Sequence, residues 1–186
     1  MNMDGSGPIQ LTKNGGVRPS ISPDGRWVVY NTLDWHLWRV PIDGGDPVRL
    51  VEHLAQFPSI SPDGKKIACL ERFESRNNLT VLILPAEGGP PLKRIEFSHG
   101  GFRGVRICWT ADNKALIFGI ERDGATALIR QPIDGSEPRE LMNFDEDELF
   151  DFGYSADGQS FAVTRGEWQH DIMLISDLMS AGKKRL

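Results

Sequence analysis

The chain has 186 residues, of which 39% are hydrophobic and 25% charged, so it is long enough for one domain with a buried core. Its net charge of −5 argues against a nucleic-acid partner, because binding to phosphates depends on a basic surface. Neither an apolar run long enough to cross a membrane nor an export signal occurs, which predicts no membrane insertion and leaves a periplasmic or a cytoplasmic location open.

The first complete repeat spans residues 13–51 and sets the pattern for the rest of the chain. A turn motif, Ser-Ile-Ser-Pro-Asp-Gly at 20–25, leads into the apolar run Trp-Val-Val-Tyr at 27–30. A second run at 37–40 leads into Pro-Ile-Asp-Gly-Gly-Asp-Pro at 41–47. Asp-Gly and Gly-Gly pairs favour tight hairpin turns, and continuous apolar runs of this length fit strands buried on both faces. This repeat is therefore predicted to form strand, turn, strand, loop, strand, turn and edge strand.

The same two motifs return in the same order in the next two repeats, residues 52–97 and 98–142. The first motif recurs unchanged at 59–64, and Cys-Trp-Thr-Ala-Asp-Asn at 108–113 is a divergent copy. A sandwich of short strands, the alternative fold, does not explain a repeat in constant phase. Because each aspartate occupies the same place in a turn, these residues are interpreted as structural rather than as metal ligands or catalytic groups. Copies of the second motif lie at 85–91 and 132–138.

The two ends of the chain hold incomplete elements. The last repeat, residues 143–178, contains a copy of the first motif at 153–158, but its final apolar run has no edge strand after it. Residues 1–12 are predicted to form a turn and an edge strand that belong to no blade of their own. Residues 179–186 are interpreted as a basic tail.

Four antiparallel strands in about 40–45 residues are the unit of a β-propeller blade. The sequence therefore predicts an all-β fold, a β-propeller of four-stranded antiparallel blades, with about four blades in this chain as part of a larger propeller. Two alternatives stay open. The strand in 1–12 completes the last blade of a closed four-blade ring, or two chains exchange these strands in an eight-blade ring.

The motifs resemble the TolB-like β-propeller repeat, which is also described as a WD40-like or Pro-Asp-Gly repeat. Residues 19–25 and 58–64 match that family's Pro-Ser-aliphatic-Ser-Pro-Asp-Gly signature closely, whereas the third and fourth copies lack the first proline. The family usually has six or seven blades. The resemblance therefore implies missing N-terminal blades from a larger chain and a bacterial source. It also implies similarity to the C-terminal part of propellers that are appended to bacterial protein kinases or transcription regulators.

The predicted register divides the connections between two faces of the disc. Both tight turns of a blade lie on one face, the turn face, and the longer connections lie on the opposite one, the loop face. Loops on a rigid scaffold concentrate binding residues, and Trp and Arg are common interface anchors. The loop face is therefore predicted to bind a protein, a peptide or a small ligand, although polar residues also collect in exposed loops without any function. The candidates are Trp35, His36, His53, Arg72, His99, Arg103, Trp168 and His170.

The chain shows no nucleophile elbow, no His-Glu-x-x-His, no phosphate-binding Gly-rich loop and no Cys-x-x-Cys. No catalytic, cofactor-binding or metal-binding residue is therefore predicted. The sequence favours a non-catalytic scaffold or sensor module with a protein or peptide partner, and either a homodimer or further blades complete the propeller. The alternative is a propeller enzyme, with a lyase or hydrolase site in the central channel, or an accessory domain that gates a peptidase.

Overall fold

In a computed structural model, the residues described are 4–13, 15–71, 79–97, 102, 106–122, 125–144, 148–155 and 159–167. These ranges form strands, turns and loops, and no helix in this part of the chain has the length and apolar character needed to cross a membrane. The strands are β1 (Val17–Ile21), β2 (Trp27–Asn31), β3 (Leu37–Pro41), β4 (Val48–Arg49), β5 (Ala55–Ile60), β6 (Lys66–Glu71), β7 (Leu79–Pro85), β8 (Lys93–Phe97), β9 (Cys108–Trp109), β10 (Ala115–Arg122), β11 (Ala125–Pro132), β12 (Arg139–Asn143), β13 (Glu148–Tyr154) and β14 (Phe161–Gly166).

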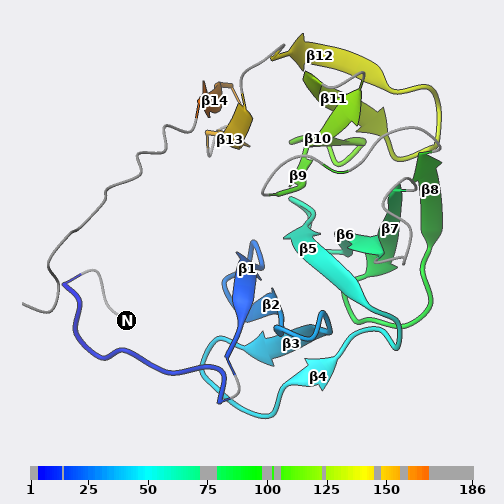
Figure 1. Cartoon of the computed structure of the whole chain (residues 1–186). Helices are drawn as coiled ribbons and strands as arrows, with labels where there is room; N and C mark the ends of the chain where they lie inside the picture. The colour runs from blue at the N-terminus through cyan, green and yellow to red at the C-terminus, as the bar shows by residue number, and fades with distance from the viewer. Residues whose placement is uncertain are drawn as a thin grey trace, which may run out of the picture.

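The strands pair in chain order into four antiparallel sheets. Three sheets have four strands each, β1 to β4, β5 to β8 and β9 to β12, and β13 pairs with β14 in a fourth. Figure 1 shows the sheets arranged along an arc, with β1, β5 and β9 toward its centre and β4, β8 and β12 at its periphery. This is the arrangement of propeller blades, so the predicted all-β propeller fold is confirmed, and the described strands form part of a ring.

The ends of the chain differ from the expected pattern. Residues 9–12 form no strand within the described chain, and the expectation that they supply an edge strand to another blade stays a prediction. Leu11 instead packs against a cluster of Val28, Tyr30 and Val40 on the outer face of the first sheet. The apolar run expected to end near Leu178 lies outside the described residues.

In the first three blades a recurring aspartate holds the turn between the first two strands. The Ser61 hydroxyl donates to Oδ1 of Asp63 at 2.6 Å, and the same oxygen accepts the backbone N–H of Lys65 at 3.0 Å. The hydrogen bond from Ser61 holds the pKa of Asp63 below its ordinary value. Thr110 and Asp112 repeat the arrangement in the third blade at 2.5 Å. The interpretation as turn residues is confirmed for Asp24, Asp63 and Asp112, and Asp157 lies outside the described residues.

The apolar core lies between neighbouring blades. Side chains of the first and second blades share one cluster, and those of the second and third share another. The inner strands show this at one repeated position. Ile60 and Trp109, each facing the preceding blade, are only 9% and 5% exposed, and Trp109 Nε1 donates to the carbonyl of Ser59 in that blade at 2.9 Å. Ile21 occupies the same position in the first blade and is 62% exposed.

The Gly-Gly turn between β7 and β8 contacts the preceding blade through its backbone. Gly88 has a φ of +87°, and a Cβ on it would lie 2.8 Å from the carbonyl oxygen of Leu50. Gly89 donates its N–H to the same oxygen at 2.9 Å. Arg39 strengthens this contact by donating to the carbonyl of Ala86 at 3.1 Å. The turn therefore requires glycine both for its conformation and for the close approach of two blades.

We expect Gly88→Ala to lower the free energy of unfolding by about 2–4 kcal/mol, because it combines positive-φ strain with a clash against a backbone oxygen. Gly89→Ala is the matched control. The φ of Gly89 is +98°, but a Cβ there would meet no atom within 4 Å. Backbone strain is then the only effect, and it should lower the free energy of unfolding by about 1–2 kcal/mol. Urea unfolding of both variants gives the two values. Equal losses would show that the approach of Gly88 to Leu50 contributes nothing.

Candidate functional site

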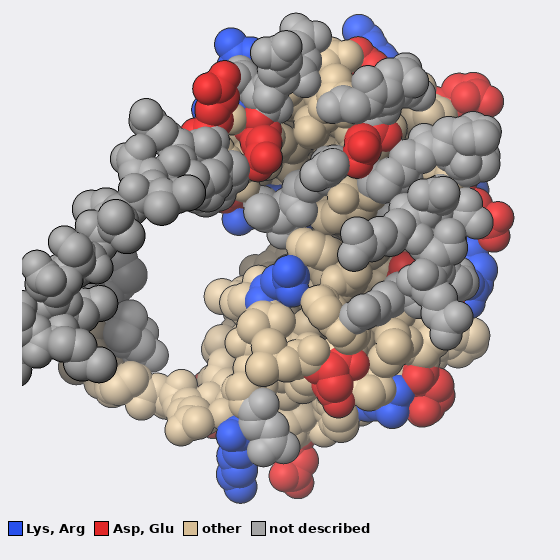
Figure 2. Space-filling view, in the orientation of Figure 1, with Lys and Arg blue, Asp and Glu red and all other residues tan. Residues whose placement is uncertain are grey.

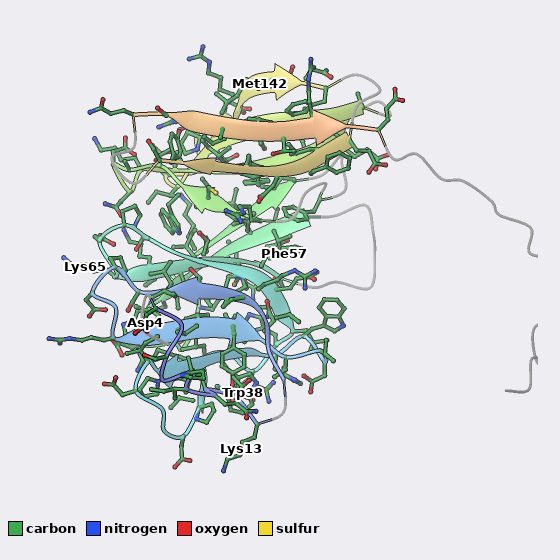
Figure 3. All side chains as sticks on the ribbon, turned by 90° about the vertical axis from the view of Figure 1, so that its left-hand side faces the viewer. Asp4, Lys13, Trp38, Phe57, Lys65 and Met142 are labelled. Atoms are coloured by element: carbon green, nitrogen blue, oxygen red, sulfur yellow. The ribbon has the colours of Figure 1, made fainter. Side chains whose placement is uncertain are left out.

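The structure separates the two faces of the disc as the register predicted. Residues 22–26 and 42–47 connect strands at one end of the first blade, and residues 32–36 and 50–54 lie at the other end. The 32–36 loop is joined to the second blade, because Ala55 at the start of β5 donates its N–H to the carbonyl of Trp35 at 2.9 Å. In Figure 3, Lys65 extends from the turn face, and Phe57 lies toward the loop face.

Three of the eight predicted site residues fall within the described ranges, Trp35, His36 and His53. The remaining five lie outside the described residues, namely Arg72, His99, Arg103, Trp168 and His170.

The two described histidines have separate acidic neighbours. His36 Nδ1 lies 3.0 Å from the carboxylate of Asp34 in its own loop. His53 Nε2 is buried and lies 3.9 Å from the carboxylate of Glu71, which also pairs with Arg94. No group of three His, Cys, Asp or Glu side chains in the described ranges could hold a metal ion. The structure thus gives these histidines local partners and does not bring them together.

Trp35, in contrast, belongs to a group of side chains from three blades that we call the loop-face array, defined as Trp35, Arg18, Phe57 and Phe102. The guanidinium carbon of Arg18 lies 4.2 Å from the centroid of the Phe57 ring and 6.0 Å from that of Trp35, within the range of cation–π attraction. The rings of Phe57 and Phe102 are 4.7 Å apart at an angle of 50°. Aromatic and cationic groups are therefore aligned along the inner ends of successive blades.

The backbone of the array is held in a conformation that costs free energy. Arg18, Trp35 and Phe57 have φ values of 53°, 68° and 56°, and Asn113 is the only other non-glycine residue of the described ranges with a positive φ. Each such residue costs about 1–3 kcal/mol, and strain of this kind concentrates at functional sites. Bulges in β1 and β5 accompany it, since the register shifts between Val17 and Ser20 and at the corresponding place in β5. A bulge redirects a side chain out of the regular alternation of a strand.

A buried amide fixes this conformation. The side chain of Asn31, at the end of β2, accepts the N–H of Phe57 at 3.1 Å and donates to the carbonyl of Ala55 at 2.6 Å. Asn31 is fully buried, so water cannot replace either bond. The first blade thereby positions Phe57 of the second.

Arg18 and Phe57 occupy one repeated position of the blades. Each lies six residues before its turn aspartate (24 − 18 and 63 − 57), and so do Arg106 and Asp151 in the third and fourth blades (112 − 106 and 157 − 151). Side chains at this position meet across blades, since Arg106 Nε lies 2.9 Å from the carboxylate of Asp151. We call it the rim position.

Sequence reasoning identified Trp35 but missed Arg18, Phe57 and Phe102. Aligning the repeats on their turn aspartates would have exposed the rim position, where the residue type changes from blade to blade. The positive φ of Arg18 and Phe57 was not predictable, because each precedes a proline, and a residue before proline normally favours an extended backbone.

The fold is shared with solved structures, whereas no protein-family model and no curated protein matches the sequence. A protein described as a TolB from Agrobacterium tumefaciens superimposes with a TM-score of 0.63 at 22% identity, over 83% of this chain and 58% of that one. TolB from Acinetobacter baumannii superimposes with a TM-score of 0.68 at 20% identity, over 87% of this chain and 41% of that one. Hydrazine synthase from Kuenenia stuttgartiensis superimposes with a TM-score of 0.60 at 21% identity, over 81% of this chain and 43% of that one.

The blades, their radial order and these similarities define the class of fold as a β-propeller. Within that class, the fold is similar to that of the two TolB structures, which agrees with the family that the turn motifs resemble. The chain spans about half the length of the solved structures it matches. The further expectation, that the propeller is appended to a protein kinase or a transcription regulator, stays a prediction.

We expect Asn31→Ala to destabilise the protein by about 2–4 kcal/mol, because it leaves the N–H of Phe57 and the carbonyl of Ala55 buried without partners. Gln131→Ala is the control. This buried amide in the third blade donates only to carbonyls of its own turn, Pro132 and Ser136. Hydrogen exchange distinguishes the two, since only Asn31→Ala should accelerate exchange of the Phe57 amide beyond the global loss of stability. Equal exchange in both variants would show that Asn31 does not hold the array.

Proposed function

We propose that this chain is a non-catalytic binding module that holds a protein or peptide partner on its loop face. The observation that carries the proposal is the loop-face array, three residues of which have strained backbones. Backbone strain is concentrated at functional sites, and aromatic and arginine side chains are common anchors of protein interfaces. The array combines both features. The array comes from three blades, so a peptide that lies across the inner ends of the blades would contact all of it.

The residue types favour a peptide or protein over a small polar ligand. Phe57, Phe102 and Trp35 are half-buried, so each presents part of an apolar ring beside the exposed Arg18. Rings held rigidly by their neighbours lose little entropy on binding, and an arginine at their edge adds directional hydrogen bonds. A side chain of a partner could therefore gain both apolar contact and a polar anchor.

A catalytic role is the alternative, and the fold does not decide between the two, because one fold carries many functions. Hydrazine synthase, which has a similar fold, is an enzyme by its name. The binding proposal is supported by the two described histidines of the loop face, since His36 and His53 each lie beside a separate carboxylate and do not converge on one site. Incubation of the bound peptides with the protein, followed by mass spectrometry, tests for turnover.

To test the proposal, the full chain is immobilised and used to select peptides from a random-sequence phage library. We expect Phe57→Ala to weaken binding of the selected peptides by about tenfold or more, since aromatic anchors contribute about 2 kcal/mol each to interfaces. Arg26→Ala on the turn face, where the side chain is 84% exposed, should leave binding unchanged. Failure to select any peptide, or selection of peptides that Phe57→Ala does not affect, would contradict the proposal.

We also propose that the outer face of the first blade takes another blade as a partner. Supporting this is Ile21, whose counterparts Ile60 and Trp109 are buried against the preceding blade. Such a blade comes either from a longer form of the chain or from a second copy. Both would bury the same apolar surface.

The solution mass of the purified chain tests which partner is used. If a second copy completes the face, light scattering should give about twice the 20.7 kDa of one chain, and Ile21→Glu should convert this species to a monomer. Leu33→Glu is the control, because Leu33 is 76% exposed in the loop between β2 and β3. A monomer that unfolds cooperatively and tolerates Ile21→Glu without loss of stability would show that the face needs no partner.

A further inference from the structure

We infer that Arg18 is a carboxylate receptor, which rests on the proposed function and names the chemistry of its partner. An acidic group of a bound peptide, either an Asp or Glu side chain or a free C-terminal carboxylate, docks on the guanidinium of Arg18. The neighbouring part of the peptide lies against the rings of Phe57 and Trp35.

The first argument is that Arg18 keeps its hydrogen-bond donors for a ligand. Its contacts within the described ranges are to the rings of Phe57 and Trp35, and its guanidinium makes no hydrogen bond or ion pair there. The rings fix the position of the cation without supplying a carboxylate or carbonyl oxygen. A guanidinium in this state presents a planar set of N–H groups that matches the two oxygens of a carboxylate.

Three other arginines of the described ranges use their donors within the protein, whereas Arg130 and Arg139 resemble Arg18 in having no hydrogen bond or ion pair there. Arg39 pairs with Glu87 at 2.6 Å, Arg49 donates to the carbonyl of Val51 at 2.9 Å, and Arg94 pairs with a glutamate. These residues stabilise contacts within or between blades. Arg18 differs from them, because the residue it meets across the blade boundary is aromatic.

The second argument is an internal precedent at the rim position. Arg106, the counterpart of Arg18 in the third blade, lies 2.9 Å from the carboxylate of Asp151 in the fourth. In the first pair of blades the counterpart of Asp151 is Phe57, which presents a ring and no carboxylate. The blade geometry thus places a carboxylate beside an arginine at one rim position and leaves the arginine available to a ligand at another.

The third argument concerns the surroundings of Arg18. The rings of Phe57 and Trp35 lie beside the guanidinium, so a carboxylate that binds to it next to these rings would be less screened by water than one in open solvent. Figure 2, which views the loop face, shows basic surface at the inner rim of the arc in surroundings that are mostly neither acidic nor basic.

The experiment uses the peptides selected on the full chain, resynthesised in matched forms. Each acidic residue is changed to its amide, Glu to Gln or Asp to Asn, and each C-terminus is made as the free acid and as the amide. We expect one of these changes to weaken binding to the unmodified chain by about tenfold or more, as for loss of a charge-assisted bond. The first change identifies a side-chain carboxylate, and the second identifies a C-terminal one.

The same peptides are measured on Arg18→Gln, Arg18→Lys and the turn-face control Arg26→Gln. Arg18→Gln should bind acid and amide forms equally, Arg18→Lys should keep a reduced preference for the acid, and Arg26→Gln should behave as the unmodified chain. Urea unfolding checks that each variant is folded. If Arg18→Gln does not fold, the comparison of acid and amide peptides on Arg18→Lys provides the test.

Two results overturn the inference, and they differ in what they leave standing. If the peptides depend on Phe57 but not on a carboxylate, or keep their acid preference in Arg18→Gln, the inference fails and the binding function stands. If the unmodified chain selects no peptide, both fail.

Discussion

The packing of each blade against the next is the constraint on which the rest of this structure depends. The middle strands are apolar on both faces, and residues such as Val29 and Leu82 are fully buried. A single four-stranded sheet cannot bury two faces, so each blade needs a neighbour on either side. Complete burial of one isoleucine stabilises a fold by about 2 kcal/mol. Ile60 is covered by the first blade and contributes this stabilisation, whereas Ile21 is 62% exposed and contributes only part of it.

The loop-face array is a product of the same packing. Arg18 and Phe57 are 39 residues apart in the chain (57 − 18) and meet only because β1 and β5 are the inner strands of adjacent blades. Asn31 crosses that boundary to hold the backbone of Phe57. The free energy that maintains the strained conformation is therefore supplied by contacts between blades. A site of this kind is rigid because the scaffold beneath it is rigid.

Constant and variable positions of the repeat serve different purposes. The turn residues, such as Ser61 and Asp63, recur with the same hydrogen bonds, because every blade needs the same hairpin. The rim position varies between arginine, phenylalanine and aspartate, and its side chains meet across blade boundaries. The fold tolerates this variation because the backbone of the inner strand is held elsewhere, by its turn and by its pairing with the second strand. Function on a propeller can thus change while the blade stays the same.

The sequence by itself determined the strands, the turns and the propeller class, because these follow from local chemistry. An Asp-Gly turn and an apolar run act over a few residues, and their regular return indicates a blade. It also placed Trp35 on the loop face. Only the tertiary structure decided that Arg18, Phe57 and Phe102 lie beside Trp35, that His36 and His53 have separate partners, and that residues 9–12 form no strand. These outcomes depend on distances between blades and on a backbone conformation that is unusual before proline, and neither is encoded in any short stretch of sequence.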